Sequence, residues 1–302
     1  MQNVVVFGGS GFVGRALCRQ LSASGSWRVR VVTRKRSNAV ALAGLPQVSV
    51  VEADIGVAEQ LRGTLEGQHA VVNLIAILHG SEQQFTAIHV DWPRRLASAC
   101  LAAGPERLLH VSAIGVDAAE PSLYARSKAE GEAVLRSIWP ACTVLRPSVI
   151  FGAEDRFLNT FERLQRFAPF VPLACSDARF QPVWVDDVAR ALAACLDEPT
   201  TGGRTFECTG PRIYTLAELV RLAGRRGGVA RPVLPLPGPL AWLQASIMEH
   251  LPGEPLMSRD NLRSMRSPNI ATPGAAGLAE LGITARSLES FLWPGGSLPK
   301  RE

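Results

Sequence analysis

Tyr124 and Lys128 stand four positions apart, and their side chains suit acid–base chemistry. Residues at i and i+4 of a helix share one face, so the Lys128 ammonium can lie near the Tyr124 phenol. A free tyrosine ionises at about pH 10, and each unit by which a cation lowers that pKa needs about 1.4 kcal/mol. The pair therefore suits proton transfer or the binding of hydroxyl groups, although the same spacing also occurs on exposed helix faces.

A glycine-rich turn lies near the start of the chain. The apolar run Val4–Phe7 leads into Gly8, Gly11 and Gly14. At a strand-to-helix junction this pattern allows a tight turn, close approach of the backbone to a pyrophosphate, and close helix packing. The helix start adds free N–H groups and about half a positive charge. We predict a dinucleotide site that uses Gly8, Ser10, Gly11, Phe12, Val13 and Gly14.

The residues after the second expected strand bear on which dinucleotide is bound. An NAD site carries an acidic residue about 20 residues beyond the loop, where it bonds the ribose 2′-hydroxyl. Here the chain has Arg34, Lys35 and Arg36 instead. Arginine matches a 2′-phosphate, and each charge-assisted hydrogen bond contributes about 1.5–3 kcal/mol. We predict NADP(H), with NAD(H) as the alternative; an ordinary basic loop is the other interpretation of the three cations.

Short apolar runs alternate with longer amphipathic ones, which implies βαβ units and a parallel sheet covered on both faces. The expected strands are Asn3–Phe7, Arg28–Thr33, Val48–Val51, Ala70–Leu74, Arg107–Val111 and Thr143–Leu145. The expected helices are Val13–Ser22, Val57–Leu65, Gln84–Ala103 and Ser122–Ser137. Within the third, we expect Asp91 to cap a helix whose first turn contains Pro93, with the preceding residues in a separate turn. Tyr124 and Lys128 then lie on the helix after the fifth strand.

The second half of the chain is less regular. It predicts helices over Asp155–Arg166 and Val188–Leu196, the second capped by Asp186 and Asp187, and a strand over Val183–Val185. An apolar helix around Leu240–Leu251 either packs on the small domain or docks a membrane-associated partner or an apolar substrate such as a quinone. The fold class we predict is α/β: a Rossmann-type doubly wound parallel sheet over 1–153 and 180–212, with a smaller mixed C-terminal substrate lobe over 154–179 and 213–302.

Composition excludes several classes of protein. The chain is 47% hydrophobic and 20% charged with a net charge of +5, and it has no basic stripe, so we expect no nucleic-acid partner. No apolar run approaches the roughly 18 residues of a membrane span. The six cysteines and five histidines lack the spacing of a metal site or disulfide framework, so we expect reduced thiols and no metal. The glycine turn begins almost at Met1, so we expect no targeting extension and a cytoplasmic setting.

Together these motifs resemble the extended short-chain dehydrogenase/reductases. The stretches that carry the likeness are Phe7–Gly14, Asp54-Ile55, His110–Ala113, Tyr124-x-x-x-Lys128, Leu145–Gly152 and Val185–Ala189. Other stretches resemble an atypical branch, typified by a nucleotide-binding accessory subunit of respiratory complex I and its bacterial relatives. They are His110–Gly115, Phe151–Asn159, Arg179–Val183 and Ser258–Asn261.

The resemblance implies a role for each matching residue. The three glycines would hold the pyrophosphate, Arg34 the 2′-phosphate, and Tyr124 and Lys128 the nicotinamide ribose. Asp54 and Ile55 would meet the adenine, although Asp54 alone could equally cap the next helix. The residues expected to line the rest of the cofactor are Leu74, Ile75, Ala76 and Pro147. The complex I branch further implies a tightly held NADPH, a respiratory or quinone-pathway protein partner, and a peripheral position at the inner membrane.

One departure from the family pattern concerns turnover. Active members usually place Ser or Thr one position after the first serine of the strand-five motif, and that position here is Ala113. Ser112 stands one residue earlier, and adjacent strand residues face opposite sides. An alignment shifted by one residue restores Ser112 as a catalytic residue. Two functions stay open: an NADP(H)-binding protein with little or no turnover, or an active NADP(H)-dependent oxidoreductase or sugar-nucleotide epimerase/dehydratase. The intact glycine turn argues against a nucleotide-free scaffold.

Four polar residues beyond the sixth strand have two interpretations. They bind an anionic or polyhydroxylated ligand, or they link the two lobes. The four are Arg156, Asn159, Arg179 and Gln181.

Overall fold

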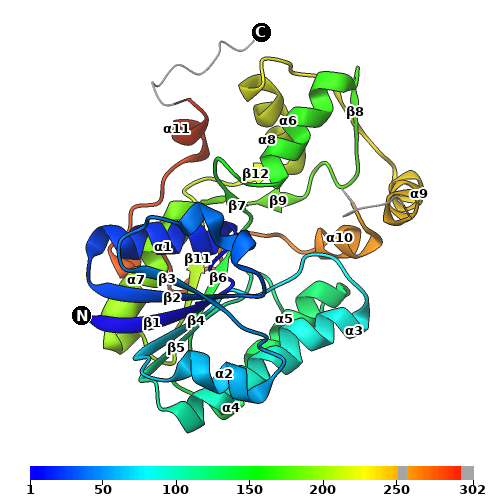
Figure 1. Cartoon of the computed structure of the whole chain (residues 1–302). Coiled ribbons are helices and arrows are strands. Elements are labelled where there is room, and N and C mark those ends of the chain that lie inside the picture. Colours follow the sequence, from blue (N-terminus) through cyan, green and yellow to red (C-terminus); the bar gives the residue numbers. More distant parts are fainter. Residues whose placement is uncertain (251–256, 294–302) are drawn as a thin grey trace.

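The computed structural model describes residues 1–250 and 257–293. Its centre is a seven-stranded parallel sheet in the order β11-β6-β5-β4-β1-β2-β3 (Figure 1). The strands are β1 (Gln2–Phe7), β2 (Trp27–Thr33), β3 (Val48–Glu52), β4 (Ala70–Asn73), β5 (Arg107–Val111), β6 (Thr143–Pro147) and β11 (Thr205–Cys208). The six expected strands are confirmed, with ends shifted by at most two residues. β11 was not expected, because its short run mixes polar and apolar residues.

Helices cover both faces of this sheet, so the doubly wound architecture is confirmed. Val4 and Val6 of β1 pack in one core with α1 (Phe12–Ser24) and α7 (Val185–Asp197). Val5 and Phe7 point to the opposite face and pack with α2 (Ala58–Leu65), α4 (Trp92–Ala103) and α5 (Leu123–Ile138). This alternation is the period-two pattern of a strand that is buried on both sides.

The connection between β4 and β5 differs from its prediction. The single stretch Gln84–Ala103 is in fact α3 (Glu82–Phe85), a π-helical segment η2 (Thr86–Asp91) and α4. Asp91 is itself helical and makes no capping hydrogen bond, so the predicted cap is wrong. Ser81 is the cap instead, in a capping box with Gln84. That Ser-x-x-Gln pattern is a sequence signal for a helix start, and we overlooked it.

The start of α7 also differs. The helix begins at Val185, not Val188, so Asp186 and Asp187 lie in its first turn and do not cap it. Asp187 is fully buried, pairs with Arg190, and accepts a hydrogen bond from the Arg286 backbone N–H at 2.7 Å. Its role is structural, and it joins α7 to the C-terminal part of the chain.

The remaining elements form the upper part of the molecule in Figure 1. Its helices are α6 (Phe157–Phe167), α8 (Leu216–Arg226), α9 (Gly238–Glu249), α10 (Arg259–Ser264) and α11 (Leu288–Leu292). Its short strands are β7 (Ile150–Phe151), β8 (Val171–Leu173), β9 (Arg179–Phe180), β10 (Val183–Trp184), β12 (Tyr214–Thr215) and β13 (Val233–Pro235). Among the residues that the structure describes there are also three 3-10 segments: η1 (Arg36–Leu42), η3 (Pro199–Thr201) and η4 (Leu278–Leu281). The assignment of these segments to two domains stays a prediction, and Leu251 and 294–302 lie outside the described residues.

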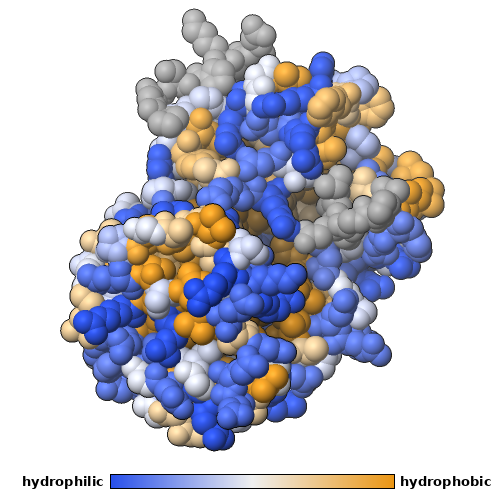
Figure 2. All heavy atoms as spheres, in the orientation of Figure 1, coloured by the Kyte–Doolittle hydropathy of each residue, from blue (hydrophilic) through white to orange (hydrophobic). Residues whose placement is uncertain are grey.

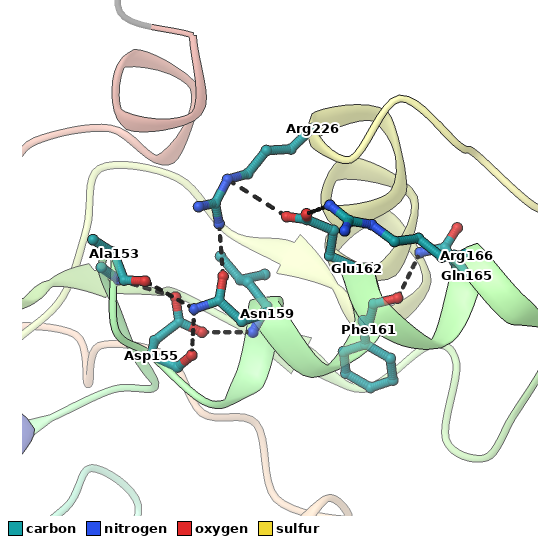
Figure 3. A network of polar contacts seen from close by, with 10 residues as sticks. Ala153, Asp155, Asn159, Phe161, Glu162, Gln165, Arg166 and Arg226 are labelled. Carbon is teal, nitrogen blue, oxygen red and sulfur yellow. Dashed lines mark hydrogen bonds and ion pairs between the residues drawn. The ribbon is translucent and has the colours of Figure 1, made fainter.

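A polar network fixes α6 against α8 (Figure 3). Arg226 of α8 donates to Asn159 Oδ1 at 2.9 Å and lies 3.6 Å from the Glu162 carboxylate. Asn159 donates through Nδ2 to the carbonyl oxygens of Ala153 and Asp155 at 3.0 and 2.6 Å. The Asn159 amide is therefore fully used inside the protein, where it joins α6 to α8 within the predicted C-terminal lobe.

Gln181 shows the same pattern between other segments. Its Nε2 donates to the Gly210 carbonyl at 2.7 Å, and its Oε1 accepts from the Ala271 N–H at 2.9 Å.

The six cysteines are free, and all but Cys175 are buried. No helix among the described residues is long and apolar enough to cross a membrane.

Candidate dinucleotide-binding site

The glycine turn lies where the order of strands reverses, because β1 has β2 on one side and β4 on the other. Ligands of open α/β sheets bind at the carboxyl ends of the strands at such a point. Gly8 follows β1 with φ +83°, and a Cβ there would lie 3.0 Å from the Leu74 carbonyl carbon. A Cβ on Gly14 would lie 2.4 Å from the Gly8 carbonyl oxygen. The turn therefore needs glycine for a left-handed conformation at Gly8 and for close packing at Gly14.

Helix α1 starts without a side-chain cap, because its N-cap is Gly11. The Gly11 N–H donates to the Gly8 carbonyl at 3.0 Å and closes the turn. The first N–H groups of a helix have no acceptor inside it, so an uncapped start offers them to an anion. The turn thus fits a pyrophosphate both sterically and electrostatically.

Arg15 braces this turn, and sequence reasoning missed it. Its guanidinium donates to the Ser10 carbonyl at 2.6 Å and pairs with Glu154, which follows β7. No motif pointed to this contact, because Glu154 is 139 residues away in the sequence.

The end of β2 presents the predicted cations. Arg34, Lys35 and Arg36 are all exposed. The nearby Glu52 carboxylate accepts a hydrogen bond from the Arg36 backbone N–H at 3.0 Å, which shapes the loop. The Arg34 side chain is therefore accessible to a ligand from solution, and its contact with a 2′-phosphate stays a prediction.

Asp54 does not cap α2. Its carboxylate accepts a hydrogen bond from the Gly56 N–H at 2.8 Å, within the turn itself, and the N-cap of α2 is Val57 without a side-chain bond. The capping interpretation is therefore wrong, and contact of Asp54 and Ile55 with an adenine stays a prediction.

Tyr124 and Lys128 lie one turn apart on α5, as expected. Lys128 is buried and donates through Nζ to the Val111 carbonyl at the end of β5, at 2.8 Å. Burial lowers the pKa of Lys128 to about 8, against an opposing effect of Glu132. Burial raises the pKa of Tyr124 to about 12. The expected lowering of the tyrosine pKa by a cation is therefore absent in these surroundings, where loss of solvent dominates.

His89, to which the sequence assigned no role, contacts Tyr124. The His89 ring packs edge-to-face on the Tyr124 ring, with centroids 5.5 Å apart. His89 Nε2 accepts from the Ile77 N–H at 3.2 Å, so Nδ1 carries the proton and donates to Ser127 Oγ at 2.8 Å. Ser127 Oγ then donates to the Tyr124 carbonyl at 2.9 Å. Burial, followed by the charge of Lys128, lowers the pKa of His89 to about 3, so the ring is neutral.

The structure also shows on which side Ser112 lies. The Ser112 and Ile114 N–H groups donate to the Leu145 and Pro147 carbonyls, at 2.8 and 3.0 Å, so strand pairing continues past β5. Successive residues of a strand face opposite sides of the sheet, so Ser112 lies on the same side as Leu108 and Ala113 on the other. Leu108 packs in the core cluster that includes residues of α5. The Ser112 hydroxyl is buried and has no hydrogen-bond partner among the described residues. A buried orphan hydroxyl on this side is consistent with a bound group that completes the site.

Fold and glycine turn define a dinucleotide-binding α/β protein of the Rossmann type. The chain belongs to the NAD dependent epimerase/dehydratase family, whose model matches residues 4–209.

The chain is similar to a respiratory subunit and to a reductase. It is 32% identical over 300 residues to the mouse (Mus musculus) NADH dehydrogenase [ubiquinone] 1 alpha subcomplex subunit 9, mitochondrial, covering 94% of this chain and 77% of that protein. It is 30% identical over 239 residues to a ceramide reductase of Caulobacter vibrioides, covering 78% of this chain and 74% of the relative.

Solved structures support the fold alone. A nucleoside-diphosphate-sugar epimerase from Staphylococcus aureus has a TM-score of 0.76 at 17% identity, covering 96% of this chain and 99% of that one. MoeE5 in complex with UDP-glucuronic acid and NAD has a TM-score of 0.74 at 21% identity, with 96% of each chain covered.

Proposed function

We propose that this chain binds NADP(H) and holds it mainly as a structural ligand, in the manner of the complex I accessory subunits, with little or no turnover. The observation that carries the proposal is the glycine turn with its uncapped helix start. Identity of 32% to the mouse alpha subcomplex subunit 9 over nearly the whole chain supports the branch.

The bound nucleotide would supply a hydride donor or acceptor at its nicotinamide, and the chain's own residues would bind and orient it. Gly8, Gly11 and Gly14 bring the backbone to the pyrophosphate. Lys128 would hold the ribose hydroxyls beside Tyr124. The residues that would line the remaining parts are Ser10, Phe12, Val13, Asp54, Ile55, Leu74, Ile75, Ala76 and Pro147.

The three exposed cations at the end of β2 support NADP(H) over NAD(H). In Arg34→Ala we expect the dissociation constant for NADPH to rise about tenfold or more, because a charge-assisted hydrogen bond is lost. NADH lacks the 2′-phosphate, so its dissociation constant should change by less than about threefold. Calorimetry with both nucleotides measures this. Arg28→Ala, an exposed cation at the other end of β2, is the matched control. Equal weakening of both nucleotides by Arg34→Ala contradicts the assignment.

One feature supports a structural rather than a catalytic nucleotide: Ala113 occupies the position of the family's usual second hydroxyl. Native mass spectrometry of the purified chain should find a retained nucleotide, and the nucleotide should raise the melting temperature without being consumed. A chain that emerges empty and gives no binding heat with NADPH or NADH contradicts the proposal.

The second candidate is an active NADP(H)-dependent oxidoreductase. Ser112 favours it, because its unpaired hydroxyl lies on the side of the sheet that α5 covers. The ceramide reductase relative suggests a ceramide-type lipid as substrate, and the family also suggests a sugar nucleotide. An active enzyme should oxidise NADPH with one of these substrates and lose about tenfold or more in rate in Tyr124→Phe. Tyr214→Phe, the other tyrosine of the chain, is the control.

We also infer a peripheral position at a membrane, next to a respiratory or quinone-pathway partner. Leu240, Leu243 and Ile247 form an exposed apolar stripe on α9, between 52 and 56% exposed. The hydrophobic residues at the right margin of Figure 2 lie where Figure 1 places this helix. Recovery of the tagged chain with membrane respiratory complexes, and its loss when Leu243 and Ile247 become Ser, test this position.

A further inference from the structure

The helix that carries Tyr124 and Lys128 is held at its start by a carboxylate from another part of the chain. Asp260 of α10 accepts hydrogen bonds from the Leu123 N–H at 2.7 Å and from the Tyr124 N–H at 3.1 Å. It also accepts one from the Ser122 hydroxyl at 2.8 Å, whose oxygen in turn accepts from the Ala125 N–H. The first N–H groups of α5 are thus bonded, directly or through Ser122, to an anion 136–138 residues away.

Asp260 is itself fixed in place. Helix α10 starts with a capping box between Ser258 and Asn261. Its neighbour Arg259 donates through both its backbone N–H and its Nε to the Glu249 carboxylate of α9, each at 2.7 Å. The carboxylate of Asp260 therefore comes from a braced unit and not from a free loop.

The anchors of α5 divide between two parts of the molecule. Lys128 bonds to the Val111 carbonyl of the central sheet, and Glu132 pairs with Arg146 of β6 at 2.6 Å. Both of these contacts hold the helix from the sheet side, one and two turns after Tyr124. At Tyr124 itself, the backbone N–H donates to Asp260, in the other part of the molecule.

We propose that Asp260 is a positioning residue for Tyr124: through the start of α5, the C-terminal part of the chain sets where the phenol lies relative to the nucleotide turn. This rests on the proposed nucleotide-binding function. Because Lys128 has its own anchor on the sheet, loss of Asp260 displaces Tyr124 more than Lys128.

The chain's tyrosine content makes this directly measurable. It has two tyrosines, so labelling with 3-fluorotyrosine gives two ¹⁹F resonances, and Tyr214→Phe assigns them. In Asp260→Ala the Tyr124 resonance should shift or broaden while that of Tyr214 stays in place. The dissociation constant for NADPH should rise about tenfold, as orientation of a binding group is lost. The matched control is Glu280→Gln, which removes a carboxylate of the C-terminal part of the chain that pairs with Arg204 and makes no contact with α5 or α10; it should leave both resonances unchanged.

Asp260→Asn is a second, milder variant for the case in which Asp260→Ala does not fold. Asn has the size of Asp but a single acceptor oxygen where Asp260 uses two, so a smaller displacement of the Tyr124 signal is expected. An unchanged Tyr124 resonance in a folded Asp260→Ala or Asp260→Asn protein overturns the proposal. So does an equal change in both tyrosines, which would show general loosening. If the unsubstituted chain binds no NADPH, the proposed function fails, whereas the ¹⁹F comparison in the ligand-free chain still decides the role of Asp260.

Discussion

The glycine turn and the tyrosine helix are built in opposite ways. The turn depends on seven residues, Gly8–Gly14, whose backbone atoms lie against one another: the Gly11 N–H meets the Gly8 carbonyl at 3.0 Å. The start of α5 depends on Asp260, and the Tyr124 ring packs on His89, which η2 supplies. One region is thus specified by local sterics, and the other by contacts between distant segments.

Because of this difference, we expect phosphate binding to be less sensitive than acid–base chemistry to changes elsewhere in the fold. Phosphate binding by a helix start needs backbone N–H groups and no side chain, so it survives changes elsewhere in the fold. Acid–base chemistry needs a phenol in a defined position and with a suitable pKa. The pKa of Tyr124 depends on its burial and on the charges and hydrogen bonds around it. A chain of this family can therefore keep its nucleotide while its turnover declines.

The largest effect should come from Gly14→Ala. The added Cβ would meet the Gly8 carbonyl oxygen at 2.4 Å and the Gly9 Cα at 2.5 Å, both backbone atoms that cannot move aside. We expect the dissociation constant for NADPH to rise about a hundredfold or more. Overpacking should also lower the free energy of unfolding by about 1–3 kcal/mol. Calorimetry and urea unfolding measure the two quantities.

Gly63→Ala is the control for that substitution. Gly63 is an exposed glycine within α2, with nothing near its Cβ position within 4 Å. Alanine there should stabilise the helix by about 0.5–1 kcal/mol and leave NADPH binding unchanged. If Gly14→Ala behaves like this control, the steric account of the turn is wrong.

Lys128→Met tests the tyrosine helix through pH. Burial lowers the pKa of Lys128 from 10.5 to about 8, so between these values the unfolded chain binds a proton that the folded chain does not. Stability must then rise with pH across this window. The rise amounts to about 3 kcal/mol for a single group, and Lys128→Met should lack it.

The measurement is urea unfolding of both proteins between pH 7.5 and 10.5, because other titrating groups cancel in the difference. A difference in unfolding free energy that does not change with pH would contradict the buried, proton-releasing lysine. In the same variant the dissociation constant for NADPH should rise about tenfold to a hundredfold, since charge-assisted hydrogen bonds to the ribose are lost.

More of the glycine turn than of the tyrosine helix could be predicted from the sequence. The strand Gln2–Phe7, the glycine spacing and the helix after them are visible because each depends on neighbours in the chain. The i,i+4 relation of Tyr124 and Lys128 is equally local. The contacts of Asp260, His89 and Arg15 were missed, because each joins segments that only the folded chain brings together.

The wrong predictions, of two helix caps and of the Tyr124 pKa, have physical causes as well. Asp91 and Asp186 looked like caps, since Asp favours that position, but packing of the preceding residues continued each helix through them. The pKa of Tyr124 was expected to fall because a cation stands near it in the sequence. It rises because the cost of burying a phenolate exceeds that attraction, and burial cannot be read from spacing.

The smallest effect should come from Glu154→Gln, which tests whether the glycine turn depends on a distant segment. Glu154, in the segment after β7, pairs with the Arg15 side chain, and its own side chain is 51% exposed. Exposed ion pairs contribute about 0–1 kcal/mol. Because Arg15 keeps its 2.6 Å hydrogen bond to the Ser10 carbonyl, the turn should keep its shape. We expect NADPH affinity to change less than about twofold by calorimetry. A loss as large as that of Gly14→Ala would mean that the turn, like the tyrosine helix, depends on a distant segment, and the contrast between the two regions would not hold.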